Sequence, residues 1–584
     1  MRTPSVQTQL KSKGLRLNTQ QLAAVKAIDG VSIVSAGAGA GKTSCIVGKI
    51  MYAATVKECA SILAVTFTKK AVAELQTRII GVQNVTVCTF HSFFYRILRS
   101  FGYKSFRFIE TDAQRAEIMR DVLQNQRFAD YLTVADIEDA LRKGVFNDGK
   151  LKEAVEAYLD KLKSLRLLEF DALQFFTLEL LQVQPAIANR VRNLYDFVLF
   201  DETQDISIVQ SDIIKQIWPA DKNNNLTFVG DAAQSIYGFR GSKADVMDDL
   251  RAFYGASTYS LTTNYRSTES ILSVANEVLT SSLKMKSSRG KGVAPIFHIA
   301  ETPSDEAQWV SEEIKRLHNT GVKLSDIAIL FRSSPAVGEL MEQLVEENIP
   351  HVKIGSNPLR WDNVRYKAFL ALLAFMHEHD NRHYKCALPL LGVPYNAADD
   401  MDETLNLPFS ELLQGLVAIS KEQRNALTEF FSINPDQRSL RELSIIVWDK
   451  WLKTYFKADN DDILDDFLAA TEKFQTFAEL RLHVNKIRRR VRIMAKLVAN
   501  PNADYVRLMS IHTSKGLEFS HVFIVGCVEG LFPDTSHDEV NMDEENRIAY
   551  VAATRAKDML YVSAYSSQKG KVVEPCRFFK EFFM

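Results

Sequence analysis

The sequence predicts an α/β protein with two parallel-sheet cores, each interrupted by a mainly helical insertion. Three observations predict this class. Short apolar or β-branched runs alternate with helix-length segments, which is typical of parallel strands joined by crossover helices. Two long stretches, residues 100–194 and 360–502, largely lack such runs and carry apolar residues at helical spacing. The composition, 46% hydrophobic and 24% charged over 584 residues, is that of a folded globular chain.

The predicted elements follow in chain order. The strands of the first core are expected at VSIVSA (31–36), SILAVTF (61–67), NVTVCTF (84–90), YDFVLF (195–200), LTFVG (226–230) and TYSLTT (258–263). Helices of the first insertion are expected at 113–124, 133–144 and 151–165. The strands of the second core are expected at DIAILF (326–331), VRLMSIH (506–512), HVFIVG (521–526) and MLYVSA (559–564). The four predicted parts are a first core (1–99 and 195–261), a first insertion (100–194), a second core (262–359 and 503–584) and a second insertion (360–502).

The charge and the cysteines exclude several classes of protein. Lys and Arg total 71 and Asp and Glu total 72, so the net charge is −1 and any polyanion site must be local. The six cysteines form no C-x-x-C pair, which argues against a zinc site and a disulfide scaffold. The longest apolar run, residues 368–376, is far shorter than the roughly 20 residues that span a bilayer. We therefore expect a cytoplasmic protein with no membrane segment.

A glycine-rich loop follows the first predicted strand. The residues AGAGAGKT precede a predicted helix, as in loops that bind phosphate through backbone N–H groups and a helix N-terminus. In such a loop the lysine binds phosphate and the hydroxyl of the next residue binds Mg²⁺. Alanine stands first where the simple pattern has glycine, so a glycine-rich turn without a ligand is the alternative. The predicted nucleotide-binding residues are Ala36, Gly37, Ala38, Gly39, Ala40, Gly41, Lys42 and Thr43.

An acidic pair follows another predicted strand, in FVLFDETQD (197–205). Asp201 is placed to hold the metal ion, and Glu202 is placed to polarise an attacking water. A solvated acidic turn is the alternative. Together with the glycine-rich loop, the pair predicts a nucleoside triphosphatase.

Ten blocks in a fixed order carry a family resemblance. The chain resembles the UvrD/Rep/PcrA group of superfamily 1 DNA helicases over nearly its full length, which implies two RecA-like motor cores. The blocks are LNTQQLAAV (17–25), AGAGAGKT (36–43), VTFTKKAVAELQTRI (65–79), TFHSFFYRILR (89–99), DETQD (201–205), VGDAAQSIYGFRG (229–241), LTTNYRS (261–267), LMSIHTSKGLEF (508–519), VEGLFP (528–533) and ENRIAYVAATRAK (545–557).

The resemblance implies nucleotide contacts outside the loop. Gln21 corresponds to the glutamine that reads adenine, Tyr265 to the ring that stacks on it, and Glu518 to a further nucleotide contact. Ser44 stands where relatives often carry arginine, so one adenine contact is expected to be missing.

The resemblance also implies catalytic residues. Gln234 corresponds to the sensor that couples the γ-phosphate to DNA, Arg266 to a γ-phosphate contact, and Arg555 to an arginine finger. Guanidinium groups that spread transition-state charge raise the rate by about 10³–10⁵. A surface salt bridge is the alternative role for each arginine.

A track for single-stranded DNA is implied in the same way. Bases stack on exposed aromatic faces for about 1–3 kcal/mol each, without sequence preference. Core packing is the alternative for any single ring. The predicted DNA-binding residues are Phe67, His91, Tyr237, Phe239, His512 and Thr513.

The second insertion departs from the family pattern. Relatives carry a turn that grips the duplex, and the corresponding stretch here, Pro389 to Pro394, has Leu391 in place of a cation. Leu391→Arg is expected to strengthen duplex binding. The basic run KIRRRVR (486–492) is either an alternative phosphate contact or a solvated helix face.

The predicted function is that of an ATP- and Mg²⁺-dependent DNA helicase or translocase moving 3′→5′ on single-stranded DNA. Its expected partners are single strands, single/double-strand junctions and a nuclease, repair or replication protein. Three alternatives remain: a translocase that strips proteins from DNA, an ATP-gated DNA-binding subunit of a nuclease or repair complex, and a small-molecule P-loop kinase.

Overall fold

The computed structural model describes residues 14–583 with short gaps. The residues outside the description are 1–13, 57–59, 126–127, 145, 147–148, 222, 239–240, 242–244, 280–283, 356–358, 379–385, 394–418, 501, 536–539 and 584. Phe239 and Pro394 lie among them, so the predictions for these two residues fall outside the described structure.

The chain forms two compact units. The first unit comprises Met1–Pro295, Lys515–Glu518 and Glu539–Leu560. The second comprises Ile296–Ser514, Phe519–Asp538 and Tyr561–Met584. Segments that the sequence assigned to the second core, among them 262–295 and 539–560, thus belong to the compact unit that holds the glycine-rich loop.

The first unit is built on a six-stranded parallel sheet. The strand order is β3 (Val85–Thr89), β2 (Ile62–Thr66), β6 (Phe197–Phe200), β7 (Leu226–Gly230), β1 (Val31–Ala36) and β8 (Ser257–Leu261). Every residue of β2, β6 and β7 is buried, which explains why these strands are continuous apolar runs. The helices around the sheet are α2 (Thr19–Lys26), α3 (Lys42–Val56), α4 (Lys69–Arg78), α5 (Phe90–Ser100), α11 (Ile208–Ile217) and α12 (Val246–Tyr254).

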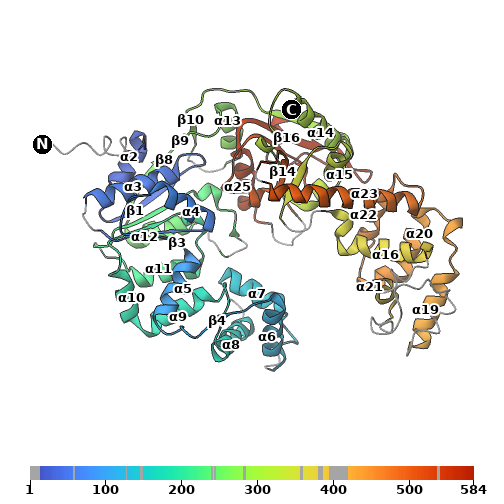
Figure 1. The fold of residues 1–584 in the computed structure, drawn as a ribbon, viewed down its shortest axis with the longest axis horizontal. Helices are drawn as coiled ribbons and strands as arrows, with labels where there is room; N and C mark the ends of the chain where they lie inside the picture. The colour runs from blue at the N-terminus through green and yellow to red at the C-terminus, as the bar shows by residue number, and fades with distance from the viewer. Residues whose placement is uncertain are drawn as a thin grey trace. The chain divides into compact units, whose positions relative to one another are not determined.

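The first insertion is helical, as the sequence predicted. Its helices are α6 (Asp112–Asn125), α7 (Val134–Lys143), α8 (Gly149–Leu165), α9 (Leu173–Val183) and α10 (Pro185–Arg192). The two-residue strands β4 (Arg107–Phe108) and β5 (Leu167–Leu168) pair in parallel. In Figure 1, α6, α7 and α8 form a group of their own, while α9 and α10 lie beside the sheet. The first unit also contains β9 (Thr263–Asn264), α13 (Glu269–Val278), β10 (Lys286–Ser287) and α25 (Met542–Ala553).

The second unit contains a second six-stranded sheet, and its described pairings are parallel. The order is β11 (Ile296–Ala300), β16 (Ala556–Tyr565), β15 (Phe519–Ile524), β12 (Ile327–Phe331), β14 (Val506–Ser510) and β13 (His351–Ile354). The two edge strands, β11 and β13, were missed at the sequence level. Both are short and half exposed: β13 (HVKI) has polar residues at two of its four positions, and the apolar residues of β11 (IFHIA) are interrupted by His298. The helices α14 (Pro303–Asn319), α15 (Gly338–Glu346) and α24 (Ile511–Ser514) accompany this sheet.

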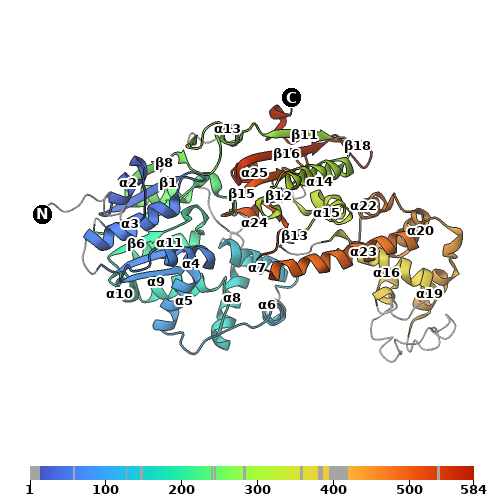
Figure 2. The same ribbon diagram turned by 45° about the horizontal axis from the view of Figure 1, so that its top comes forward.

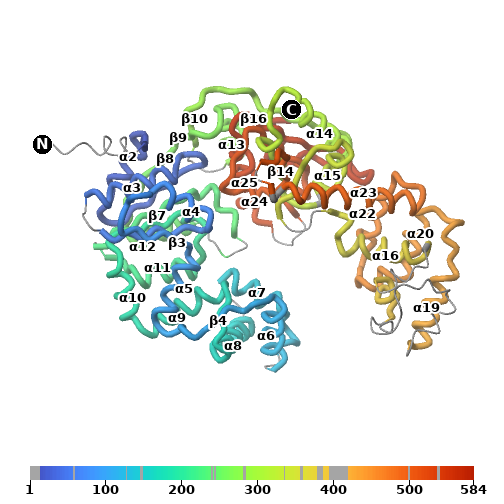
Figure 3. The backbone as a smooth tube through the Cα atoms, viewed as in Figure 1, coloured from blue at the N-terminus to red at the C-terminus, as the bar shows by residue number. Residues whose placement is uncertain are grey.

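The second insertion is also helical. Its described helices are α16 (Val364–Glu378), α19 (Lys421–Ser432), α20 (Leu440–Val447), α21 (Lys453–Tyr455), α22 (Asp462–Thr471) and α23 (Phe477–Ala495). Figure 2 shows α23 as one long helix that runs from beside β13 and α15 toward α16 and α20, and the tube in Figure 3 follows the same course. Two parallel-sheet cores with helical insertions confirm the predicted fold class.

The turn in the second insertion differs from the expectation. Leu388–Leu391 forms a 3-10 turn in which Leu391 is only 4% exposed. Gln423 donates to the carbonyl oxygen of Gly392 at 2.9 Å and covers the end of the turn. Leu391 is thus a core residue, so an arginine there would be buried, and the premise behind the expectation that Leu391→Arg strengthens duplex binding does not hold.

In the part of the chain that the structure describes, no helix combines the length and the apolar character needed to cross a membrane.

Candidate functional site

The candidate site lies at the carboxyl edge of the first sheet, where ligands bind in open α/β folds. Four neighbouring strands end here. The glycine-rich loop follows β1, Phe67 follows β2, Asp201 follows β6, and Asp231 follows β7. The sheet order therefore brings together residues that lie nearly 200 positions apart in the chain.

The glycine-rich loop needs its glycines for close packing. Gly39 and Gly41 have backbone φ angles of +66° and +78°, which residues with a Cβ rarely adopt. A Cβ on Gly41 would lie 2.6 Å from Nε2 of Gln21, and one on Gly39 would lie 2.7 Å from Nδ2 of Asn264. A Cβ on Gly37 would lie 2.1 Å from Sδ of Met285. Three long-range neighbours thus press on the loop backbone.

Lys42, the first residue of α3, meets the acidic pair predicted to serve the metal and the water. Its Nζ donates to Oε2 of Glu202 at 3.1 Å. Burial on its own would lower the pKa of Lys42, but Glu202, Asp231 and Asp201 raise it. Burial and the charge of Glu202 raise the pKa of Asp201. Burial would raise the pKa of Glu202 as well, but Lys42 and Lys515 lower it. Lys42 and Lys515 thus favour the ionised form of Glu202, the form that can polarise a water.

A chain of hydrogen bonds runs from Glu202 to Arg555. Gln204 donates from Nε2 to Glu202 at 2.7 Å, and its Oε1 accepts from the backbone N–H of Asp231 at 2.9 Å. The side chain of Gln234 donates to Asp231 at 2.5 Å, and Nη2 of Arg555 donates to Oε1 of Gln234 at 3.3 Å. The predicted sensor Gln234 thus lies between a carboxylate and the predicted arginine finger.

Arg266 lies beside Arg555. Its Nε donates to Glu518 at 2.6 Å, and its Nη1 donates to the carbonyl oxygen of Thr554 at 3.1 Å. Burial and the positive charge of Arg266 lower the pKa of Arg555 to about 9. The two predicted γ-phosphate arginines are close enough to repel each other, which favours the arrival of an anion between them.

The predicted adenine side is assembled around α2. Gln21 donates from Nε2 to the carbonyl oxygen of Ala40 at 2.9 Å, and so contacts the loop itself. Asn18, which caps α2, donates from Nδ2 to the hydroxyl of Tyr265 at 2.7 Å. The ring of Tyr265 is 45% exposed and free to stack. Glu518 joins Arg266 and Lys557, with its Oε1 3.1 Å from Nζ of Lys557.

The predicted DNA residues fall into separate groups. The rings of Phe67 and Tyr237 are parallel, with centroids 6.4 Å apart, and both are half-buried. His91 packs edge-on against Phe170 in the first insertion, and burial lowers its pKa. His512 and Thr513 lie in the second unit, on the short helix α24, where the hydroxyl groups of Thr513 and Ser510 are 2.9 Å apart.

Comparison with known proteins identifies the family. The UvrD-like helicase C-terminal domain matches residues 259–567, which is more than half of the chain. The chain belongs to the UvrD-like helicase family. The UvrD/REP helicase N-terminal domain matches residues 17–130 and 110–254.

Curated relatives of this UvrD-like chain carry the name ATP-dependent DNA helicase PcrA. The protein from Staphylococcus epidermidis is 28% identical, over 97% of this chain and 86% of the relative. The proteins from Staphylococcus aureus and Bacillus subtilis are each 29% identical, over 97% and 94% of this chain and 86% and 82% of the relatives. These findings confirm the predicted resemblance and the predicted class of enzyme, an ATP-using DNA helicase.

The acidic pair of this UvrD-like chain fits Mg²⁺. Mg²⁺ prefers oxygen ligands and is usually bound through one or two carboxylates together with substrate phosphates. Asp201 and the hydroxyl of Thr43, at the start of α3, supply such oxygens next to the loop. Burial and the neighbouring Glu202 raise the pKa of Asp201 and so disfavour its ionised form. A divalent cation would stabilise that ionised form. Among the described residues no three His, Cys, Asp or Glu side chains gather as a protein-only metal site, so phosphate would complete the set.

Three residues that hold the site were missed at the sequence level. Lys515 donates to both carboxylate oxygens of Asp205, at 2.7 and 2.6 Å, and to the backbone oxygen of Gln234 at 2.6 Å. Asn264 is fully buried, donates to the Ala38 carbonyl at 2.6 Å and accepts from the backbone N–H of Arg266 at 2.8 Å.

Arg289 is the third. Its Nη1 donates to the backbone oxygens of Arg266 and Lys557 at 2.6 and 3.0 Å, and its Nη2 donates to Asp558 at 2.7 Å. Lys515 and Asn264 stand inside quoted blocks and could have been found there. Arg289 lies in none of the ten motif blocks. Its partners Arg266, Lys557 and Asp558 come from distant parts of the chain, so only the folded structure reveals them.

Proposed function

We propose that this chain is an ATP-dependent motor that moves 3′→5′ along single-stranded DNA and unwinds duplex ahead of it. The observation that carries the proposal is the continuous contact chain from Lys42 through Glu202, Gln204, Asp231 and Gln234 to Arg555. It joins the phosphate loop to a catalytic arginine through a sensor glutamine. The direction of movement rests on the family resemblance.

The site residues divide the hydrolysis between them. Lys42 and the loop N–H groups bind the phosphates, and Glu202 orients and polarises the attacking water. Arg266 and Arg555 stabilise the charge that develops on the transferred group. Thr43 and Asp201 would hold Mg²⁺, which when bound supplies further charge stabilisation.

Each cation of the site already has an oxygen partner in this structure. Lys42 contacts Glu202, Arg266 contacts Glu518, and Arg555 contacts Gln234. A γ-phosphate that enters would replace these oxygens with its own, and it would give Arg555, whose partner Gln234 is neutral, an anion. Glu202, released from Lys42, then becomes available to the water.

Coupling to DNA follows from the position of Gln234. Lys515 binds the backbone oxygen of Gln234 and also lies 4.7 Å from the centroid of the Tyr237 ring, which stacks with Phe67. A shift of Gln234 toward the γ-phosphate therefore moves an aromatic pair that is suited to bases. We propose single strands and single/double-strand junctions as substrates, with a nuclease, repair or replication protein as partner.

The test compares ATPase rates and strand displacement. We expect ATP hydrolysis to rise strongly when a single-stranded oligonucleotide is added. We also expect release of the labelled strand from a duplex with a 3′ tail and not from one with a 5′ tail. Lys42→Ala should abolish both activities while single-strand binding persists. Equal ATPase rates with and without DNA would refute the coupling, and preference for the 5′ tail would refute the direction.

A further inference from the structure

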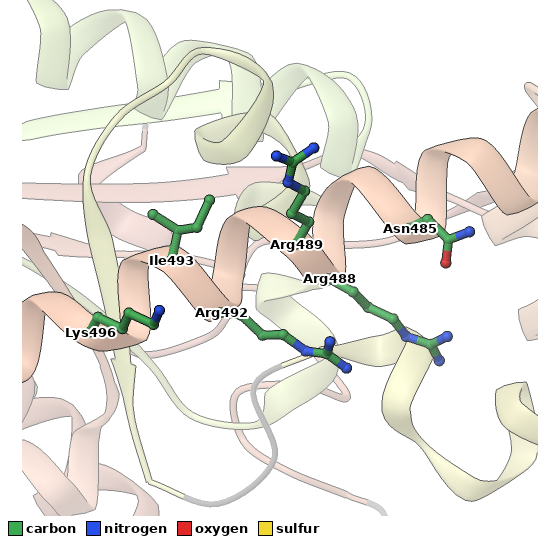
Figure 4. A pocket seen from close by; sticks show the side chains of 6 residues that line it. All are labelled: Asn485, Arg488, Arg489, Arg492, Ile493 and Lys496. Carbon is green, nitrogen blue, oxygen red and sulfur yellow. The ribbon is translucent and has the colours of Figure 1, made fainter.

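One face of the C-terminal half of α23 is strongly cationic. It lines a hollow of about 490 Å³, and no lining residue is acidic. Figure 4 shows the side chains that line it. They recur at spacings of three and four residues, so they share one side of the helix. The lining residues are Asn485, Arg488, Arg489, Arg492, Ile493 and Lys496.

The sequence concentrates this charge in one segment. Residues 480–503 contain seven Lys and Arg and no Asp or Glu, in a chain whose net charge is −1. Cations in the last turn of a helix complement its dipole, which would account for Arg492 and Lys496 alone. Arg488 and Arg489 lie further back. Arg488–Arg492 and Arg492–Lys496 are like-charge pairs four residues apart, and each costs the helix about 0.2–0.5 kcal/mol. The charge therefore exceeds what the helix itself requires.

Some arginines of α23 are structural and others are not. Arg488 is anchored, since its Nε and Nη2 donate to Asp362 at 3.1 Å and to the Trp361 carbonyl at 2.9 Å. Arg490 donates to the side chain of Asn348. By contrast, Arg489, Arg492 and Lys496 are exposed, and no hydrogen bond or ion pair ties their side chains to any other described residue. These three cations, which we name the α23 triad, are available to an external anion.

We propose that the α23 triad binds the phosphate backbone of duplex DNA. The proposal rests on DNA being the substrate of the motor, and it assigns the duplex contact to α23. From Arg489 to Lys496, the residue that follows the end of α23, the backbone rises about 10 Å at helical pitch, the length of about three phosphate steps of one strand. A rigid row of cations of this length fits a phosphate backbone.

The absence of rings on this face favours duplex over single strand. Sites for single strands combine cations with aromatic platforms on which bases stack. None of the side chains that line the hollow is aromatic. A duplex keeps its bases stacked inside and presents phosphates, which cations can bind without reading the sequence. The leucine side chains of the turn at Leu388–Leu391 are buried and offer no cation to a phosphate.

The experiment compares two triple variants. The first is Arg489→Ala, Arg492→Ala and Lys496→Ala. The matched control removes three other exposed arginines of the same insertion, by Arg424→Ala, Arg438→Ala and Arg441→Ala, for the same loss of charge. Binding of a labelled blunt duplex and of a single-stranded oligonucleotide is measured by fluorescence anisotropy across a salt titration, without nucleotide.

The triad variant should bind the duplex on the order of 10–100-fold more weakly at low salt. The slope of log K against log salt should fall by about 2.7, that is 0.9 for each of three phosphate contacts. Single-strand binding and DNA-stimulated ATPase should stay at the level of the unmodified protein, as should all readings of the control.

Three results would overturn the proposal: an unchanged duplex affinity and slope, an equal loss in the control variant, or an equal loss of single-strand binding. Arg492→Glu alone should weaken duplex binding further than Arg492→Ala, and equal effects would also contradict it. Failure of the proposed motor function is distinguishable, because it would show as ATPase of the unmodified protein that DNA does not stimulate.

Discussion

Arg555 holds its guanidinium group in the interior, and no carboxylate among the described residues binds it directly. It is 1% exposed, and its N–H groups donate to neutral oxygens, those of Val551, Leu517, Thr554 and Gln234. A buried charge of this kind is costly unless an anion completes it. At the scale of the residue, the site is therefore prepared for phosphate at the expense of stability.

We predict that Arg555→Met lowers ATP turnover by on the order of 10³-fold, while KM for ATP changes far less, because a finger acts mainly on the transition state. The same change should leave the thermal midpoint equal or higher, since an apolar side chain of similar length replaces a buried charge. Steady-state ATPase kinetics and thermal unfolding measure both. A variant with near-normal kcat and a raised KM would show that Arg555 is a ground-state contact.

Arg289 contacts the backbone beside the two arginines that we propose to be catalytic. It binds the carbonyl oxygens of Arg266 and Lys557 and so joins the two segments that carry Arg266 and Arg555. We predict that Arg289→Ala lowers kcat by on the order of 10–100-fold with little change in KM, because small displacements of catalytic groups reduce turnover steeply.

Arg289→Lys should recover part of the turnover, since an ammonium group can replace some of the donors. Arg251→Ala, which removes an exposed arginine paired with Asp248 three residues away, serves as the control. The role assigned to Arg289 would be wrong if its loss lowered the melting temperature and left kcat unchanged.

At the scale of the element, one buried carboxylate fastens α23 to the second core. Glu342 on α15 is 3% exposed. It accepts from Arg360 Nε at 2.7 Å and from Trp361 Nε1 at 2.8 Å, and its other oxygen lies 3.0 Å from Nε2 of His483 on α23. Burial alone would raise the pKa of Glu342, but His483 and Arg360 lower it to about 2.

This depressed pKa predicts that the contact between Glu342 and His483 on α23 is lost at acidic pH. The folded state holds Glu342 ionised, so its contribution to stability is present above the ordinary pKa of 4.5 and is lost as the pH falls toward 2. Glu342→Ala should destabilise the protein by about 1–3 kcal/mol at neutral pH, because the buried Trp361 Nε1–H loses its acceptor and Arg360 keeps only Glu339, at 3.9 Å. Urea unfolding at pH 7 and pH 4 measures this. If Glu342→Ala lowered the free energy of unfolding no more than a surface substitution does, Glu342 would not be the residue that holds α23 to the second sheet.

At the scale of the whole molecule, buried carboxyl groups with raised pKa values occur in both units. Burial raises the pKa of Asp205 to about 6 in the first unit and that of Glu306 to about 7 in the second. Glu306 accepts from the Gly526 backbone N–H at 2.9 Å and from the Ser563 hydroxyl at 2.6 Å, and so links α14 to two strands of the second sheet.

For both groups the folded-state pKa lies above the unfolded value, so their contribution to stability is full below about pH 4 and falls as the pH rises through the folded pKa. The protein without nucleotide should therefore be more stable at pH 5.5 than at pH 7.5. Glu306→Gln should reduce this difference by about 1–3 kcal/mol, because it removes one of the titrations. Denaturant unfolding of both proteins at the two pH values tests it. If Glu306→Gln left the difference in stability between pH 5.5 and pH 7.5 unchanged, groups other than Glu306 would be responsible for it.

The sequence by itself determined the two sheets, the phosphate loop, the acidic pair and the family. These depend on local information, because a buried strand must be apolar and a phosphate loop must carry glycines next to Lys-Thr. Only the tertiary structure decided that β11 and β13 are strands, that Leu391 is buried, and that Arg289 binds the backbone beside Arg266 and Arg555. Short, half-exposed edge strands give a weaker pattern than buried central ones, and the partner of a side chain depends on which loops the sheet order brings to one edge. That order is a property of the folded chain and not of any one segment of it.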